Sequence, residues 1–267
     1  MKISIIIATK NEEQNIERLL TSLKKQTFKD FEIIIVDNFS KDKTLKIAQK
    51  YTKNTFKSGP ERSAQRNFGL KKSNGSYILF LDADMEPEES VLKECFDILD
   101  KDKKTKGVII EEKSVGKSFL SRVKTLEKEL YLDVSNIEAA RFFRKKDLIK
   151  IGAYDQNLIS GEDWDLTERI KKIGNIKRIK AQIKHWENQS LAHEISKKYY
   201  YAKYIKYYAK KYPKRFKDQS DIRLRLKILF RNPKLVLEHP LEFIGLILLK
   251  FTQYLVYLFA GLSNYVK

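Results

Sequence analysis

The chain of 267 residues carries 54 Lys and Arg against 35 Asp and Glu, a formal net charge of +19. Its 42% hydrophobic residues are enough to form a substantial core, which excludes a disordered, collagen-like or low-complexity chain. Cys95 is the single cysteine, so a disulfide framework and a cysteine-based zinc site are excluded and a reducing compartment is expected.

The first 110 residues alternate continuous apolar runs with helical patterns. Apolar runs predict strands buried on both faces, at 3–8, 31–36 and 77–81. Apolar residues at helical spacing predict the intervening helices, near 16–23, 45–51, 61–73 and 91–99. The first run is short and ends in polar residues, so we interpret it as a core strand and not as a signal peptide. This alternation predicts an α/β fold of Rossmann type, with a mostly parallel sheet and flanking helices.

The pattern is looser in the second half of the chain. We expect further strands at 107–110, 139–143 and 176–183, and helices at 119–130 and 166–173, the second of which ends at Gly174. From about residue 190 onward the sequence is typical of helices. We therefore predict an α/β domain over residues 1–192 and a basic, Tyr-rich helical region over 193–267.

Polar residues follow each of the first three predicted strands, at 9–12, 37–40 and 82–84. Ligands of open α/β sheets bind beyond the carboxyl ends of the strands, so three converging clusters predict a site, although any one of them could be a helix cap. The loop after the first strand has no glycine, which excludes a dinucleotide fingerprint and a P-loop.

Two carboxylates directly follow the third strand. Asp82 and Asp84 leave the strand on the same side and could hold a hard divalent cation, with substrate phosphates as its remaining ligands. The motif is short and common by chance, so its position after a buried strand carries the argument.

A second acidic motif opens a predicted helix at 161–166. Asp163 lies where the helix dipole favours an ionised carboxylate and could act as a general base. The alternative is that these acidic residues only stabilise the N-terminus of the helix. Arg62 and Arg66 could clamp phosphate, or they could lie on a solvated helix face.

Taken together, these strings resemble the family 2 glycosyltransferases, which have the GT-A fold. The resemblance covers roughly residues 3–190 and rests on the strings at 5–12, 36–40, 65–69, 75–77, 82–84 and 161–163. Asn38 and Phe39 depart from the pattern, since the family usually has an acid and a glycine at these positions.

The resemblance implies a role for each motif. It implies a nucleotide-sugar pocket lined by Thr9, Asn11, Glu12, Asp37, Arg66 and Asp82. It implies a Mg²⁺ or Mn²⁺ site formed by Asp84, Asp82 and His185, although a lone histidine could equally be structural. It also implies that Asp163 is the general base and that Glu162 supports acceptor binding.

The implied reaction moves a sugar from a nucleotide-diphosphate sugar to the hydroxyl of a glycan or lipid-linked acceptor. A divalent ion neutralises the diphosphate leaving group, and one base takes the proton of the attacking hydroxyl, which inverts the anomeric configuration. A covalent intermediate on a nucleophilic aspartate is the weaker choice, because no second carboxylate stands at a suitable place.

The excess positive charge is concentrated near the C-terminus. Residues 197–234 hold 14 Lys and Arg, two Asp and seven Tyr, which suits an anionic membrane surface or, less well, nucleic acid. The following segment, 241–266, is strongly apolar and is interrupted by Glu242, Lys250, Thr252, Gln253, Ser263 and Asn264. Of these, Glu242, Gln253 and Asn264 are spaced by 11 residues and so share one narrow face of a helix. We expect this helix to lie in the membrane interface rather than to span the bilayer, or else to be buried against protein. The expected location is cytoplasmic, peripheral or monotopic at the membrane face.

Two other functions remain open from the sequence. A sugar-phosphate nucleotidyltransferase would need a Gly-rich, Arg-containing loop after the first strand, which residues 8–13 lack. A non-catalytic nucleic-acid-binding or lipid-binding protein would leave Asp82, Asp84 and Asp163 without a purpose.

Overall fold

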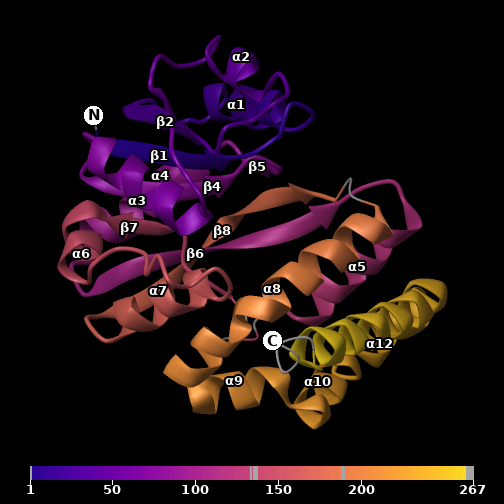
Figure 1. Cartoon of the computed structure of the whole chain (residues 1–267). Helices are drawn as coiled ribbons and strands as arrows, with labels where there is room; N and C mark the ends of the chain where they lie inside the picture. The colour runs from indigo at the N-terminus through magenta and orange to yellow at the C-terminus, as the bar shows by residue number, and fades with distance from the viewer. Residues whose placement is uncertain (1, 133, 135–137, 188–189, 263–267) are drawn as a thin grey trace. The chain divides into compact units, whose positions relative to one another are not determined.

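The computed structural model describes residues 2–132, 134, 138–187 and 190–262. The chain divides into two compact units (Figure 1). The sheet unit comprises Met1–Glu112, Ala139–Gln156 and Glu162–Trp186, and the helical unit comprises Lys113–Glu138, Asn157–Gly161 and Glu187–Lys267. Both units are therefore assembled from segments that are discontinuous in the sequence.

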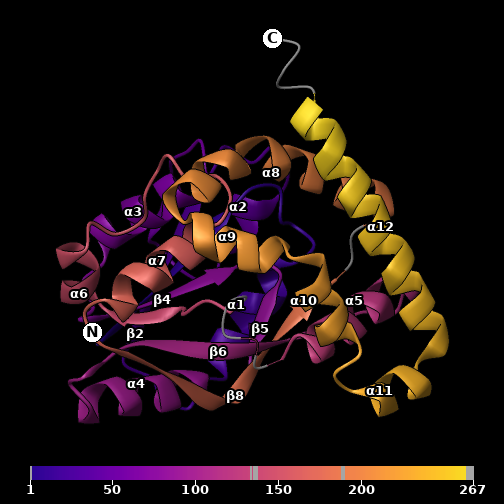
Figure 2. The ribbon, with the colours of Figure 1, turned by 90° about the horizontal axis from the view of Figure 1, so that it is seen from below.

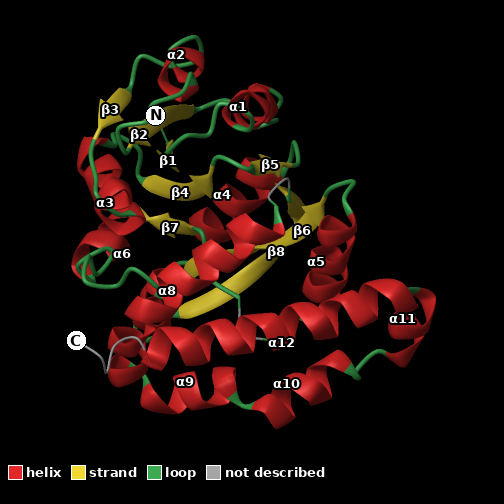
Figure 3. Cartoon of the chain, turned by 45° about the vertical axis from the view of Figure 1, so that its right-hand side comes forward, coloured by secondary structure: helices red, strands yellow, loops and turns green. Residues whose placement is uncertain are grey.

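An eight-stranded mixed sheet forms the centre of the fold, in the order β3-β2-β1-β4-β7-β6-β8-β5. Its strands are coloured yellow in Figure 3. Their bounds are β1 Ile3–Thr9, β2 Phe31–Asp37, β3 Thr55–Lys57, β4 Tyr77–Asp82, β5 Met85–Pro87, β6 Thr105–Val115, β7 Phe142–Arg144 and β8 Asn175–Trp186. The pairs β1–β2, β1–β4 and β2–β3 are parallel, whereas β7 pairs antiparallel with β4 and β6, and β5 pairs antiparallel with β8.

The strand β1 is apolar at nearly every position because both of its faces are buried. Ile3, Ile5 and Ile7 pack in one apolar cluster with residues of α1 and α4, while Ile6 packs in the opposite cluster. The helices of the sheet unit are α1 Ile16–Lys24, α2 Thr44–Ala48, α3 Arg62–Lys72, α4 Val91–Lys101, α6 Lys145–Lys150 and α7 Glu162–Lys171. The predicted α/β architecture of this part of the chain is confirmed.

The helical unit contains α5 Phe119–Leu130, α8 Leu191–Lys211, α9 Pro213–Ser220, α10 Ile222–Leu229, α11 Pro233–Glu238 and α12 Pro240–Leu262. Its apolar core joins α5 to α12 through residues that include Val123, Leu126, Leu246 and Leu249. Figure 2 shows α12 as the long yellow helix. The last predicted turn of this helix, with Asn264, lies outside the described residues.

A buried carboxylate ties together the strand ends opposite the predicted site. Glu32 on β2 accepts a hydrogen bond from Ser4 Oγ at 2.6 Å and another from Asn74 N at 2.6 Å. Burial by itself would raise the pKa of Glu32, but these hydrogen bonds outweigh it and hold the pKa below its ordinary value.

We predict that Glu32→Gln lowers the free energy of unfolding at pH 7 by about 1–3 kcal/mol, since the ionised acceptor is lost. A depressed carboxyl pKa contributes stability that is present above the unfolded-state pKa of about 4.3 and is lost as the pH falls below it. Urea unfolding between pH 3 and 7 should therefore show a shallower loss of stability on acidification for the variant. Parallel curves for the two proteins would contradict this role of Glu32.

Candidate active site

The register of the parallel strands brings the first predicted clusters to one edge of the sheet. Thr9 lies opposite Asp37, and Ala8 lies opposite Asp82. Thr9 Oγ1 donates a hydrogen bond to Asp37 Oδ1 at 3.0 Å, and the Asp37 side chain is fully buried. This hydrogen bond joins the carboxyl ends of β1 and β2.

The two loops that leave β1 and β2 are also hydrogen-bonded to each other. Asn11 Oδ1 accepts from Lys41 N at 2.9 Å, and Asn11 N donates to Ser40 Oγ at 2.8 Å. Glu12 N donates to Thr44 Oγ1 at 2.7 Å. The structure thus brings Thr9, Asn11, Glu12 and Asp37 into one bonded set of loops, with Phe39 exposed beside them at a positive φ of 51°.

The string at 65–69 fits α3 tightly against the sheet. Gln65 Nε2 donates to the backbone oxygens of Thr9 and Val36, at 3.0 and 2.6 Å. A Cβ on Gly69 would lie 2.4 Å from Ile6 Cγ2, so only glycine permits this approach. Close packing at Gly69 places Arg66, one turn earlier in the helix, within the sheet unit and not on a solvated face.

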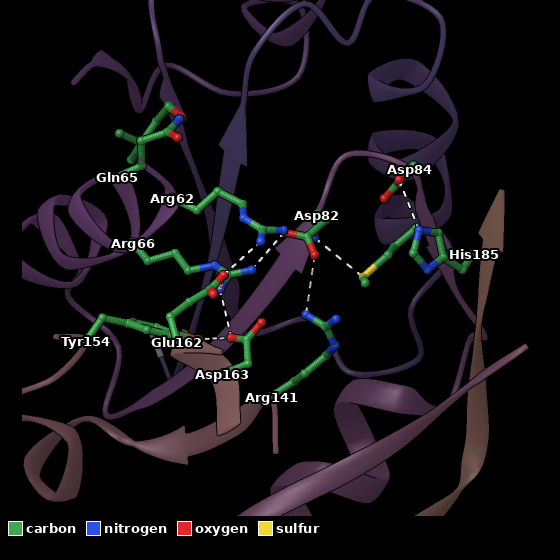
Figure 4. A network of polar contacts seen from close by, with 12 residues as sticks. Arg62, Gln65, Arg66, Asp82, Asp84, Arg141, Tyr154, Glu162, Asp163 and His185 are labelled. Atoms are coloured by element: carbon green, nitrogen blue, oxygen red, sulfur yellow. Dashed lines mark hydrogen bonds and ion pairs between the residues drawn. The ribbon is translucent and has the colours of Figure 1, made fainter. Parts of the chain in front are cut away.

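Arg66 is the centre of a buried ion network (Figure 4). Its guanidinium has no exposed surface and lies 2.8 Å from Asp82 Oδ1, 2.8 Å from Asp163 Oδ1 and 3.8 Å from Glu162 Oε1. The ring of Tyr154 lies 5.1 Å from the guanidinium carbon, and its hydroxyl donates to Asp163 Oδ1 at 2.8 Å. The predicted contact of Arg66 with a diphosphate stays a prediction, because the observed partners of this side chain are carboxylates.

The arginines set the protonation of the surrounding acids. Burial by itself would raise the pKa of Asp82, but the charges of Arg66, Arg141 and Arg62 outweigh it and hold that pKa well below its ordinary value. Burial raises the pKa of Glu162, and the neighbouring charge of Asp163 adds to the increase, against the opposing effect of Arg62 and Arg66. Asp82 and Glu162 are thus held in different environments, since the pKa of the first is lowered and that of the second is raised.

The carboxylates of Asp82 and Asp84 have different partners, although the residues are two apart. Asp82 Oδ2 lies 3.6 Å from Arg141 Nη1, within the arginine network. Asp84 Oδ2 lies 3.0 Å from His185 Nε2, because β5 pairs with β8 in the register that sets Met85 opposite His185. Within the described residues, no cluster of three or more His, Cys, Asp or Glu is arranged to hold a metal ion.

The sequence interpretation missed three residues of this site, and two of them, Arg141 and Glu112, connect the Asp82 group to the Asp84 group. Arg141 Nη2 lies 2.6 Å from Glu112 Oε1, and Glu112 Oε2 lies 3.2 Å from His185 Nδ1. Tyr154 is the third, as the aromatic partner of Arg66 and Asp163. Arg141 is a charged residue inside the otherwise apolar run 140–143, and this position could have identified it as a functional candidate. Glu112 and Tyr154 have no comparable signal.

A family model described as glycosyl transferase family 2 matches residues 4–153, more than half of the chain. The chain belongs to this family. It is 37% identical over 111 residues to the poly(ribitol-phosphate) beta-N-acetylglucosaminyltransferase TarS of Staphylococcus aureus, an alignment that covers 38% of this chain and 19% of TarS. It is 34% identical over 95 residues to the GalNAc(5)-diNAcBac-PP-undecaprenol beta-1,3-glucosyltransferase of Campylobacter jejuni, covering 32% of this chain and 30% of that protein. The chain thus aligns with less than a third of each of these relatives.

Solved structures show the same fold. The complex of Staphylococcus aureus TarS 1-349 with UDP-GlcNAc superimposes with a TM-score of 0.57 and 24% identity, covering 90% of this chain and 73% of that one. The mannosyltransferase PcManGT of Pyrobaculum calidifontis, in complex with GDP-Man and Mn²⁺, superimposes with a TM-score of 0.60 and 17% identity, covering 98% and 75% of the two chains. The sheet unit is therefore a GT-A fold, as the resemblance implied.

We predict that Arg66→Met lowers the free energy of unfolding by about 3–5 kcal/mol, because it leaves buried carboxylates without their counter-charge. The matched variant Arg62→Met should cost less, since the Arg62 side chain is 36% exposed and its buried partner Glu162 keeps Arg66 Nη1 at 3.8 Å. Urea unfolding at pH 7 measures both. Equal losses in the two variants would show that Arg66 is not the centre of the network.

Proposed function

We propose that this chain transfers a sugar from a nucleotide-diphosphate sugar to an acceptor hydroxyl by an inverting single displacement, with Asp163 as the general base. The observation that carries the proposal is the environment of the Asp163 carboxylate. Its Oδ1 accepts from both Arg66 Nη1 and Tyr154 Oη, whereas its Oδ2 has no hydrogen bond within the described part of the chain. One oxygen is thus anchored and the other is available to receive a proton.

Two features support this role. The Asp163 side chain is 26% exposed, so an acceptor hydroxyl can reach it, and it stands in the first turn of α7 beside the cation of Arg66. Gly161, with a φ of 80°, turns the chain into this helix. Glu162, held by Arg62 and Arg66, would position the acceptor from the neighbouring residue.

The donor would bind at the carboxyl ends of β1, β2 and β4. We propose that Thr9, Asn11, Glu12 and Asp37 shape the nucleotide end of this pocket, and that Asp82 lies at its sugar-phosphate end. TarS and PcManGT bind UDP-GlcNAc and GDP-Man in their solved complexes, which supports a nucleotide-diphosphate sugar as the donor class here. Because Asn38 and Phe39 depart from the family pattern, we propose no particular nucleobase for the donor.

Asp84 and His185 are the residues that would hold Mg²⁺ or Mn²⁺. Asp84 Oδ1 is buried and has no hydrogen-bond partner among the residues that the structure describes, and Asp84 Oδ2 faces His185 Nε2. A carboxylate and an imidazole suited to such an ion therefore stand together. When bound, the ion would neutralise charge on the diphosphate leaving group. Glu112, on the other ring nitrogen, would fix the orientation and tautomer of the imidazole.

The acceptor would be a glycan or a lipid-linked glycan at the cytoplasmic face of a membrane. Two observations support this proposal: the Campylobacter jejuni relative is named for an undecaprenol-linked acceptor, and α12 contains a segment, Pro240–Ala260, that is long and apolar enough to cross a membrane. The chain's family membership and its carboxylate site favour this function over a nucleotidyltransferase or a non-catalytic binding protein.

We predict that Asp163→Asn lowers the transfer rate by about 10²–10⁴-fold, since the proton acceptor is removed. Binding of the nucleotide sugar should be retained, because Asp163 acts on the acceptor and not on the donor. Asp97→Asn, on the surface of α4, is the matched control and should turn over normally. Radiolabel transfer and donor titration measure the two quantities, and normal turnover by Asp163→Asn would refute the assignment.

We predict that Glu112→Gln weakens Mn²⁺ binding by about 10–100-fold, because the imidazole loses the carboxylate that orients it. Electron paramagnetic resonance of free Mn²⁺, titrated with protein in the presence of a nucleoside diphosphate, measures this without reference to turnover. Glu111→Gln, at the neighbouring position of β6, is the matched control and should bind Mn²⁺ like the wild type. Identical affinities for Glu112→Gln and Glu111→Gln would remove Glu112 from the site.

A further inference from the structure

The helix α12 turns its polar side chains toward protein. Glu242 accepts a hydrogen bond from Arg122 Nε at 2.9 Å, and Lys250 forms an ion pair with Glu127, both across the contact with α5. Gln253 is only 9% exposed. In an ordinary amphipathic helix of a soluble protein the arrangement is the reverse, with polar residues outward.

The outward side of α12 is apolar along the described length of the helix. Between 241 and 260 none of the exposed side chains is charged, and the large exposed ones are Leu241, Ile244, Ile247, Leu248, Phe251, Tyr254, Leu255, Tyr257, Leu258 and Phe259. We call this surface the α12 apolar face. A contiguous apolar surface of this kind marks a binding surface.

We propose that the α12 apolar face docks the helical unit onto an anionic lipid bilayer, with α12 lying in the plane of the interface. Charge argues for lipid as the partner. The segment before α12 exposes Leu224, Leu226 and Phe230 next to basic residues, and residues 197–234 carry a net charge of +12. The Phe230 ring lies 5.5 Å from that of Phe243 on α12, so the basic segment adjoins the apolar helix. Basic residues at a membrane surface are attracted by anionic headgroups at about 1 kcal/mol each.

The packing of α12 favours an in-plane position over a span. The helix lies side by side with α5 and α8 (Figure 1). A Cβ on Gly245 would lie 2.8 Å from Phe119 Cζ, so the α12 backbone lies directly against side chains of α5. If α12 crossed the bilayer, the ion pairs of Glu242 and Lys250 and the lysine-rich α8 would be carried into hydrocarbon, at a cost of several kcal/mol for each charge. An interfacial helix buries only its outer side, to a depth of about 5–10 Å.

This inference deepens the proposed function, since it places the chain where a lipid-linked acceptor is found, but it rests on the packing of the helical unit and not on the transfer chemistry. The two can therefore fail separately. Asp163→Asn should bind vesicles like the wild type, and a variant that loses the membrane should keep its affinity for a soluble nucleotide sugar.

The test is flotation of the full chain with vesicles of phosphatidylcholine alone or mixed with phosphatidylglycerol. The variant Ile244→Gln/Leu248→Gln/Phe251→Gln changes three side chains that are 58%, 61% and 60% exposed, so the fold should be kept, and an unchanged melting temperature verifies this. Ile149→Gln, 60% exposed on α6, is the matched control. We expect the wild type and the control to float with the anionic vesicles, less so at high salt, and the triple variant to bind at least tenfold more weakly.

Depth is measured with Phe251→Trp and brominated lipids, after subtraction of the signal of Trp164 and Trp186. Bromines near the headgroup should quench the new tryptophan more strongly than bromines near the bilayer centre. Stronger quenching by the deep bromines would overturn the in-plane arrangement. Equal flotation of the triple variant would overturn the docking surface. A third outcome would also overturn the docking surface: a wild type that does not bind vesicles and sediments as a dimer, with a triple variant that sediments as a monomer. The α12 apolar face would then be the contact between two copies of the chain.

Discussion

The site depends on one buried guanidinium. Arg66 has no exposed surface, and desolvating an isolated cation would be prohibitive, so its burial is tolerable only because Asp82, Asp163 and Glu162 surround it. Since those acids come from β4 and the start of α7, the same ion pairs that permit its burial fix the position of a strand end relative to a helix start. The charge that stabilises the network is also what keeps Asp82 ionised.

The network continues from Arg66 to the second group of ionisable residues. Asp82 links Arg66 to Arg141, Arg141 is paired with Glu112, and Glu112 contacts His185, which faces Asp84. The proposed base and the proposed metal ligands therefore lie at the two ends of one continuous set of charged side chains. An arrangement of this kind holds catalytic groups in position before a substrate binds, which is the condition for electrostatic catalysis.

The sequence predicted the parts of the site that follow from local pattern. Apolar runs located β1, β2 and β4, and the polar residues at their ends identified Thr9, Asp37 and Asp82, because the ends of parallel strands share one edge. The separation of Asp84 from Asp82 was not predictable. It depends on β5, a three-residue strand without a periodic signal, and on its antiparallel register with β8. Glu112 and Tyr154 could not be predicted from the sequence either, since their roles arise from long-range contacts alone.

The orientation of the C-terminal helix could not be predicted from the sequence either. Its thin polar stripe was visible in the sequence, but the direction in which the stripe points depends on α5, which supplies Arg122 and Glu127 as partners. Only the structure shows that the polar side is satisfied by protein and that the apolar side is left outward.

The central claim is that Asp163, organised by Arg66, serves a single inverting displacement. Its most direct test is proton NMR of the slow hydrolysis of α-linked nucleotide sugars by the wild-type protein, with water as the acceptor. The first sugar released should be the β anomer, before mutarotation mixes the two forms. Release of the α anomer first would mean retention through two steps and would contradict the account.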